Sequence, residues 1–488
     1  MTFTTLSFVL LLIVSFFLYW GIRKRSHQNF LVLLVSYFFY GWWDYRFCFL
    51  LFVSSLVDYL VGLTLANVEN SRLRRLLLVT SLCSNLGLLG FFKYWNFFTD
   101  SLVSALTTLG WQVDFFTLQI ILPVGISFYT FQTLSYTIDI YRRQLQPTYN
   151  FIDYLAYVSF FPQLVAGPIE RATHLLPQFE KPRSFSSVQA VDGCQQILWG
   201  FAKKMLVADN LAPIVDVAYS NPADFPGPQL AFATFAFAFQ IYCDFSAYSD
   251  IAIGTARLFG FDLMRNFAYP YFSQSMAEFW RRWHISLSTW LRDYVYIPLG
   301  GSRVDSAIRR AANVMITFLI SGLWHGASWN FIVWGGIHGG VVLSEKLWTQ
   351  RISLRVKDMP GGLGWLPHPG VAFRMLLTFT LVCVAWVFFR AQTLSDALYI
   401  LTQIASDFFK VSAYQSLGEI LIPSLIGRGV LVVLAVFILI EWLQRAYPHP
   451  LVMKHTYRPV RWIAYTSIFW ITLFWGTWSP GQFVYFQF

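Results

Sequence analysis

The sequence predicts an all-α, polytopic integral membrane protein. Of its 488 residues, 56% are hydrophobic and 19% are aromatic, whereas 12% are charged; a soluble domain carries roughly 25% charged residues. Apolar runs of about 20 residues, the length that crosses a bilayer as a helix, recur along the whole chain. We therefore expect one membrane domain, 1–488. Its parts are N-terminal spans (1–141), a central part with cytoplasmic or re-entrant elements (142–310), a histidine-bearing segment (311–348) and C-terminal spans (349–488).

The basic residues predict the topology. The first apolar run, 5–22, precedes the basic triplet 23–25, which is the reverse of the order in a secretory signal, so we expect a retained spanning helix. Basic residues collect on the cytoplasmic side, which places the N-terminus outside. The later basic clusters at 72–75 and 142–143 fall on the same side if the runs at 30–43, 47–66, 76–92 and 115–140 also span. The net charge of +10 suits loops beside anionic lipids and does not require nucleic acid.

Two stretches depart from regular spans. Pro123 and Gly125 interrupt the run 115–140, and we expect them to kink its helix. Residues 151–165 are too short for a span and are more typical of a re-entrant or interfacial segment. Basic residues continue to Lys203 and Lys204, so we expect the region 142–204 to lie largely on the cytoplasmic face. Five scattered cysteines without a CxxC pair suggest neither a disulfide framework nor a zinc site.

The long apolar run 230–258 carries two carboxylates, Asp244 and Asp250. On a regular helix six positions correspond to about 240°, so the two side chains would not share a face. Either the helix breaks between them or each serves a different neighbour. They could pair with arginines or hydroxyls inside the bundle, or line a tunnel.

Residues 265–310 are the most polar part of the chain. The spacing of Trp283, Leu287, Trp290 and Tyr294 predicts one helix with an apolar stripe, and His284 would share another face with Ser288. An interfacial anchor helix explains the tryptophans and arginines. The density of histidine, arginine, aspartate and hydroxyl groups favours a chemical role instead.

Residues 323–339 place His325 and His338 inside an almost wholly apolar segment. An ionisable side chain at membrane depth is costly, so it persists mainly where it pairs, lines a cavity or does chemistry. A histidine of near-neutral pKa is a natural general base for acyl transfer to a hydroxyl. Thirteen positions correspond to about 220° on a regular helix, so the two histidines would point apart unless residues 326–328 break it. One catalytic histidine, His325, is favoured over a pair, and no metal-binding spacing is present.

Several motifs of this chain are long and specific: Trp324-His325-Gly326, the run from Phe279 to Tyr294, and four shorter stretches, 123–129, 166–168, 242–250 and 299–303. They resemble the motifs of the membrane-bound O-acyltransferase (MBOAT) family, and in particular its bacterial branch that acetylates exopolysaccharides such as alginate. The resemblance covers nearly the whole chain.

The resemblance implies a helical funnel with re-entrant segments and a transmembrane tunnel. It also implies that His325 is catalytic and that His284 is the second functional histidine. The acyl donor would enter from the cytoplasm, and the acetyl group would pass to a periplasmic partner of the SGNH-hydrolase type, or a small membrane partner protein, that serves the polysaccharide. The D-alanylation branch, which acts on teichoic acid, shares some of these elements, so D-alanyl transfer is an alternative.

We therefore expect an acetyltransferase of the bacterial inner membrane that uses acetyl-CoA as donor substrate and binds no cofactor or metal. Polar and aromatic residues of the central region are the candidates for binding donor or acceptor: Arg281, Arg282, Trp283, Ser288, Arg292, Asp293, Asp244, Asp250, Trp324, Asn330 and His338. His284, Arg281, Arg282 and Arg292 would face the cytoplasmic donor, on an element separate from His325. The arginines would hold the donor phosphates or, equally well, contact lipid headgroups. The rival functions are a polymer or lipid transporter and a non-catalytic scaffold.

Overall fold

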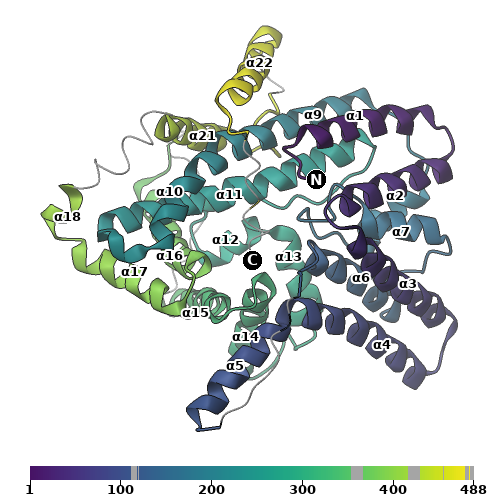
Figure 1. Ribbon diagram of the computed structural model, residues 1–488, viewed down its shortest axis with the longest axis horizontal. Coiled ribbons are helices and arrows are strands. Elements are labelled where there is room, and N and C mark those ends of the chain that lie inside the picture. Colours follow the sequence, from purple (N-terminus) through teal and green to yellow (C-terminus); the bar gives the residue numbers. More distant parts are fainter. Residues whose placement is uncertain are drawn as a thin grey trace. The chain divides into compact units, whose positions relative to one another are not determined.

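A computed structural model of the chain describes residues 1–111, 118, 120–352, 366–415, 429–453, 456–478 and 483. Within these residues every regular element is a helix, which confirms the predicted all-α class (Figure 1). The chain forms two compact units. Unit 1 comprises residues 1–197 and 251–264, and unit 2 comprises residues 198–250 and 265–488.

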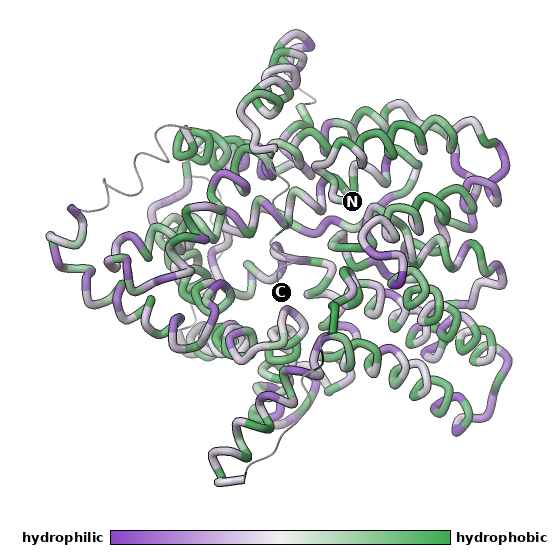
Figure 2. Tube along the Cα trace, in the orientation of Figure 1, coloured by the Kyte–Doolittle hydropathy of each residue, from purple (hydrophilic) through white to green (hydrophobic). Residues whose placement is uncertain are grey.

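Four helical stretches of the described residues are long and apolar enough to cross a membrane: Tyr45–Asn67, Ser71–Thr108, Gly227–Leu258 and Pro369–Arg390. Two shorter apolar helices, Leu6–Gly21 and Val430–Gln444, accompany them. Figure 2 shows apolar residues along most helices and hydrophilic residues in many of the connections. The chain is thus a multi-pass membrane protein, as its composition predicts.

Unit 1 contains the N-terminal helices. They are α1 (Leu6–Gly21), α2 (Arg25–Gly41), α3 (Tyr45–Asn67), α4 (Ser71–Leu89), α5 (Trp95–Thr108), α6 (Ile126–Tyr141), α7 (Phe151–Ser159), α8 (Ala172–Glu180) and most of α9 (Ser187–Ala202). Helices α3, α4 and α6 pack against one another. Polar bonds join them inside the bundle, because the Ser81 hydroxyl and the Asn85 amide both donate to the buried carboxylate of Asp58.

The expected helix kink at Pro123 and Gly125 is wrong, because both residues lie before the first turn of a helix. Helix α6 begins at Ile126, and residues 120–125 are not helical; residues 112–117 and 119 of the expected span lie outside the described part. Gly125 has a φ of +79°, and a Cβ there would lie 2.7 Å from the carbonyl oxygen of Leu164. Glycine is therefore required, since it adopts positive φ without a clash.

The short segment after residue 150 forms α7, a helix of nine residues. Such a helix cannot span a bilayer. Most of its side chains are buried within unit 1, and Asn29 donates to the carboxylate of Asp153 over 2.7 Å. The predicted short element therefore exists, and it is enclosed by protein.

A buried carboxylate, Glu170, joins α8 to the end of unit 1. It accepts from the backbone N–H of Met264 and lies 2.7 Å from Nδ1 of His174. This hydrogen bond raises the pKa of His174 above its usual 6.5. A raised histidine pKa contributes stability that is fully present below pH 6.5 and is lost as the pH rises through the raised value.

We expect His174→Gln to lower the melting temperature of the purified protein more at pH 6 than at pH 8.5. The exposed His27 of α2 offers a control, since His27→Gln should change the melting temperature little and equally at both values. Equal destabilisation by His174→Gln at the two pH values would contradict the ion pair.

Unit 2 contains the remaining helices. They are α10 (Asp209–Ser220), α11 (Gly227–Leu258, its first part), α12 (Met276–Arg282), α13 (Ile285–Leu291), α14 (Ala307–His325), α15 (Trp329–Ile352), α16 (Pro369–Arg390), α17 (Leu394–Asp407), α18 (Val411–Gln415), α21 (Val430–Gln444) and α22 (Arg458–Trp475). Short π-helical turns lie at Lys203–Ala208 and Arg292–Tyr296. Helices α14 and α15 form a tightly packed hairpin, and α16 packs against α15.

Candidate active site

His325 is the last residue of α14, at the turn of the α14–α15 hairpin. The helix ends because Gly326 is extended, with φ −160° and ψ 152°, and α15 starts at Trp329. The two backbones touch: a Cβ at Gly322 would lie 2.1 Å from the carbonyl oxygen of Phe331. The glycines of this segment therefore set the spacing of the hairpin that carries His325.

The imidazole of His325 lies among aromatic rings. Its centroid is 4.9 Å from those of Trp324 and Trp334 and 5.4 Å from that of Phe389 on α16. The side chain is 4% exposed. Surroundings of this kind strengthen every electrostatic interaction of the ring and keep bulk water away.

His284 lies beside His325, with 6.4 Å between the two ring centroids. It also meets Trp324 at 5.7 Å and Phe245 of α11 at 4.7 Å. The expected grouping, which set His284 with the arginines and apart from His325, is therefore wrong. The structure brings both histidines into one buried cluster.

The local backbone explains this placement. The single helix expected through Trp283 and Tyr294 is wrong, because α12 ends at Arg282 and α13 begins at Ile285. His284 at the break has φ 44° and ψ 54°, a left-handed conformation that is costly for a residue with a Cβ and that occurs mostly at functional sites. The break turns the imidazole inward, and the side chain is completely buried.

The polar partner of His284 is Asn266, whose Oδ1 lies 3.1 Å from the imidazole Nδ1. Burial lowers the pKa of His284 to about 3, so the ring is neutral at pH 7. A neutral imidazole can accept a proton from a hydroxyl group.

His338 occupies the next position in the aromatic cluster, 4.7 Å from Trp334 between ring centroids. Its Nδ1 accepts a hydrogen bond of 3.2 Å from the indole N–H of Trp280, and Phe279 stacks on the ring. His338 is thus a hydrogen-bonded residue of helix α15. Trp334 contacts both His325 and His338 and lies between them in this chain of contacts.

The predicted donor-binding residues of the α12–α13 region divide into two groups. Trp283 is buried, and the hydroxyl of Ser288 donates to its carbonyl oxygen over 3.3 Å. Arg281 and Arg292 are exposed. Arg282 pairs with Glu278, and Arg292 pairs with Asp293 at 2.7 Å. The structure therefore does not bring the guanidinium groups into the buried histidine cluster.

Asp244 and Asp250 lie on one unbroken helix, α11, and each pairs with a different lysine. Asp244 lies 2.6 Å from Nζ of Lys204, and Asp250 lies 2.6 Å from Nζ of Lys203. The second alternative from the sequence, a separate neighbour for each carboxylate, is confirmed, with lysines in place of arginines.

Lys203 and Lys204 are 3% and 2% exposed, and both lie in the π-helical turn Lys203–Ala208. Lys204 also pairs with Asp209 at 2.7 Å, and Lys203 donates to the hydroxyl of Ser246 at 2.7 Å. Buried charges persist where they are paired in this way.

Two asparagines have structural bonds near the cluster. Asn330 of α15 donates to the carbonyl oxygen of Ala391 over 2.7 Å, which fixes the hairpin to the end of α16. Sequence reasoning missed Asn266. The signal was a lone asparagine between Arg265 and Phe267 in an irregular stretch, where no helical period shows what it faces.

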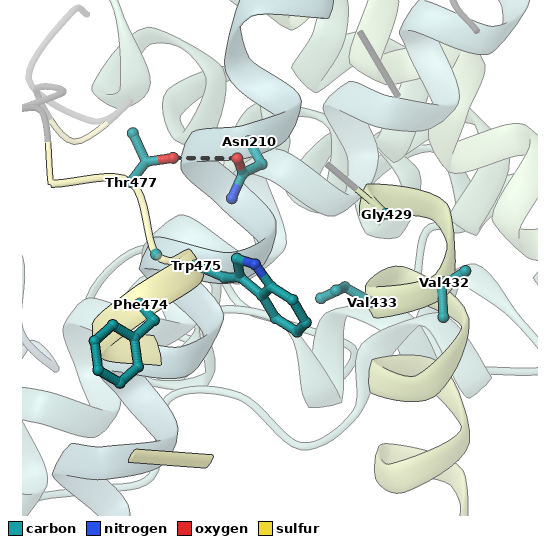
Figure 3. Close-up of a pocket in the computed structure, with 8 residues that line it drawn as sticks. Asn210, Gly429, Val432, Val433, Phe474, Trp475 and Thr477 are labelled. Atoms are coloured by element: carbon teal, nitrogen blue, oxygen red, sulfur yellow. Dashed lines mark hydrogen bonds between the residues drawn. The ribbon is translucent and has the colours of Figure 1, made fainter. Parts of the chain in front are cut away.

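The described residues contain no group of three or more His, Cys, Asp or Glu side chains placed to hold a metal ion. A cavity of about 630 Å³ lies in unit 2 between α21 and α22. Figure 3 shows Trp475 and Val433 facing it, with the Thr477 hydroxyl bonded to Asn210 over 3.1 Å. None of the residues that line it is a predicted site residue, so we place the active site at the histidine cluster.

Comparison with known proteins identifies the family of the chain. The family model for the membrane-bound O-acyltransferases matches residues 141–388, a range that contains both histidines of the cluster. The chain belongs to the membrane-bound O-acyltransferase family. The family resemblance of its sequence motifs is confirmed, and the chain is an O-acyltransferase.

Bacterial relatives of this family resemble the chain over most of its length. A probable alginate O-acetylase of Azotobacter vinelandii is 40% identical over 402 residues, which are 81% of this chain and 76% of the relative. A peptidoglycan O-acetyltransferase of Helicobacter pylori is 36% identical over 76% of this chain and 72% of its own. A teichoic acid D-alanyltransferase of Streptococcus thermophilus is 28% identical over 54% and 68%. These names support the alginate O-acetylation branch.

Proposed function

We propose that this protein takes an acetyl group from cytoplasmic acetyl-CoA and delivers it across the inner membrane for O-acetylation of an extracytoplasmic polysaccharide. The observation that carries the chemistry is the pair of buried histidines, His284 and His325, 6.4 Å apart in an aromatic cluster. The names of the relatives at 36% and 40% identity, which act on peptidoglycan and alginate, support the acetyl group and the polymer class.

His325 acts as the general base in this proposal. Its imidazole takes the proton of an acceptor hydroxyl as the oxygen attacks the thioester carbonyl. The carbon–sulfur bond then breaks, and the CoA sulfur leaves as a thiolate that takes up a proton. Proton transfer by a positioned side chain contributes about 100- to 10,000-fold to such rates, and holding the two reactants together at the cluster adds to it.

The proposed route ends on a partner. A periplasmic acetyltransferase of the SGNH type, or a small membrane partner protein, would receive the acetyl group and modify the polymer, so the polysaccharide acceptor is reached indirectly. With the N-terminus outside, the basic triplet 23–25 lies on the cytoplasmic side beside anionic lipid. The exposed Arg281 and Arg292 would contact the phosphates of the donor or lipid headgroups.

The alternative acyl group is D-alanine, which a relative at 28% identity transfers to teichoic acid according to its name. The non-enzymatic alternative is a polymer or lipid transporter, in which the buried carboxylates would serve a translocation path. Asp244 and Asp250 are each paired with a lysine, and this observation favours a structural role for them over a path.

Turnover separates these functions. The full chain in proteoliposomes, supplied with labelled acetyl-CoA and with a periplasmic extract as the source of the acceptor hydroxyl, should release free CoA at a rate that rises with protein concentration. A transporter or scaffold would release none. A D-alanyl transferase would also release no CoA from acetyl-CoA. Under the same conditions it would instead transfer D-alanine from an activated D-alanine donor.

A further inference from the structure

A non-helical segment, residues 265–268, holds the break at His284. The backbone N–H of Ala268 donates to the carbonyl oxygen of Arg282 over 2.9 Å, and the N–H of Ile285 donates to the carbonyl oxygen of Asn266 over 2.9 Å. The first N–H groups of a helix lack partners within that helix, and the side chain of His284 does not cap α13. Asn266 therefore supplies this capping from a distant part of the chain.

The side chain of Asn266 is held in one orientation. It is 1% exposed, and its Oδ1 lies 3.3 Å from the backbone nitrogen of Ser286 and 2.9 Å from the Ser286 hydroxyl. A backbone N–H can only donate, so the atom that faces it is the amide oxygen. The amide nitrogen correspondingly donates to the hydroxyl of Ser249 on α11 over 3.0 Å.

This orientation determines where the imidazole hydrogen lies. The same Oδ1 is 3.1 Å from Nδ1 of His284, and an amide oxygen can only accept. Nδ1 therefore carries the hydrogen, and in the neutral ring the lone pair is on Nε2. Which nitrogen of a histidine is basic is set by the hydrogen bond that the other one makes.

We propose that Asn266 is a positioning residue that keeps His284, the histidine beside the general base His325, in the Nδ1–H tautomer, with its lone pair on Nε2. This inference rests on the proposed function. Asn266 acts through His284 and not on the substrate, and Ser249 and Ser286 keep its amide from rotating.

The hydroxyl of Ser286 lies 3.5 Å from Nδ1 of His284, and aromatic contacts come from Phe245, Phe267 and Trp324. His325 on α14 is the titratable group that faces it at ring-contact distance. A change in the acid limb of the pH–rate profile that follows a substitution at Asn266 therefore reports on this histidine pair.

Two substitutions at Asn266 separate positioning from packing. Asn266→Ala removes the acceptor, whereas Asn266→Asp keeps an acceptor oxygen toward Nδ1 and adds a negative charge. The matched control is Asn313→Ala, because Asn313 is also buried, at 3% exposed, and bonds to a backbone carbonyl, that of Gly301, over 3.0 Å. All variants are measured as the full chain in proteoliposomes, by release of free CoA from labelled acetyl-CoA and by melting temperature.

We expect Asn266→Ala to lower kcat by about 10- to 100-fold, by analogy with the loss found when the hydrogen-bond partner of a metal-ligating histidine is removed, with KM within about twofold of wild type. Asn266→Asp should have the wild-type kcat on the plateau of the pH–rate profile. The acid limb of its pH–rate profile should move to higher pH, because the carboxylate stabilises the protonated ring of His284, which then becomes neutral only at higher pH. Asn313→Ala should leave kcat and the profile as in wild type.

The inference fails if Asn266→Ala keeps the wild-type kcat, or if the acid limb of Asn266→Asp stays in place. A loss of the melting transition in both Asn266 variants also counts against it, since the role of Asn266 would then be in folding. Absence of CoA release by the wild-type protein would instead contradict the proposed function.

Discussion

His325→Gln is expected to lower acyl transfer by about 100- to 10,000-fold, the contribution of a positioned general base. Glutamine keeps much of the volume of the side chain and can form hydrogen bonds, so the aromatic contacts with Trp324, Trp334 and Phe389 should hold the fold. It cannot accept and return a proton near neutral pH. The measurement is the rate of CoA release by the purified full chain, with the melting temperature as a check on folding.

His338→Gln is the matched control, because His338 belongs to the same buried cluster and also contacts Trp334. Its Nδ1 accepts the indole N–H of Trp280, a bond that a glutamine oxygen can replace. We expect a loss of less than about tenfold. Equal losses in the two variants would show that the cluster is sensitive to any substitution and would remove the special role of His325.

The second large effect concerns stability. Lys204→Met should lower the free energy of unfolding by about 3–5 kcal/mol, because removing one partner of a buried ion pair leaves uncompensated charge. Here the ammonium group is shared by Asp209 and Asp244, at 2.7 and 2.6 Å, so two carboxylates lose their partner at once. We expect a melting temperature several degrees lower, measured in detergent.

Lys410→Met provides the comparison. Lys410 also pairs with an aspartate, Asp407, at 2.9 Å, but its side chain is 60% exposed. Pairs of this kind contribute about 0–1 kcal/mol, so the melting temperature should barely change. A Lys204 variant as stable as Lys410→Met would mean that water or another cation reaches the two carboxylates.

The fold class followed from local information. Hydropathy and run length predicted the apolar helices α1, α2, α3, α4 and α11, because in a membrane each spanning segment must satisfy its backbone bonds internally. His325, too, was found from local sequence, since a histidine in an apolar run has few explanations.

The errors share one physical cause, which is contact between residues far apart in the chain. Helical periodicity assumes regular φ and ψ, so it could not predict the left-handed conformation of His284, which Asn266 holds from outside the helix. The local sequence did not show that Lys203 and Lys204 are buried, because their carboxylate partners on α11, Asp250 and Asp244, lie 47 and 40 residues further along the chain.

The order of these residues along the chain also has a consequence for biosynthesis. The ribosome completes Lys203 and Lys204 before it completes α11, the helix that carries Asp244 and Asp250. Lys204 can meet Asp209 of α10 first, whereas Lys203 pairs with Asp250 of α11. A lysine buried without its partner costs several kcal/mol, so we expect the π-helical turn Lys203–Ala208 to become fully buried only after α11 has been made.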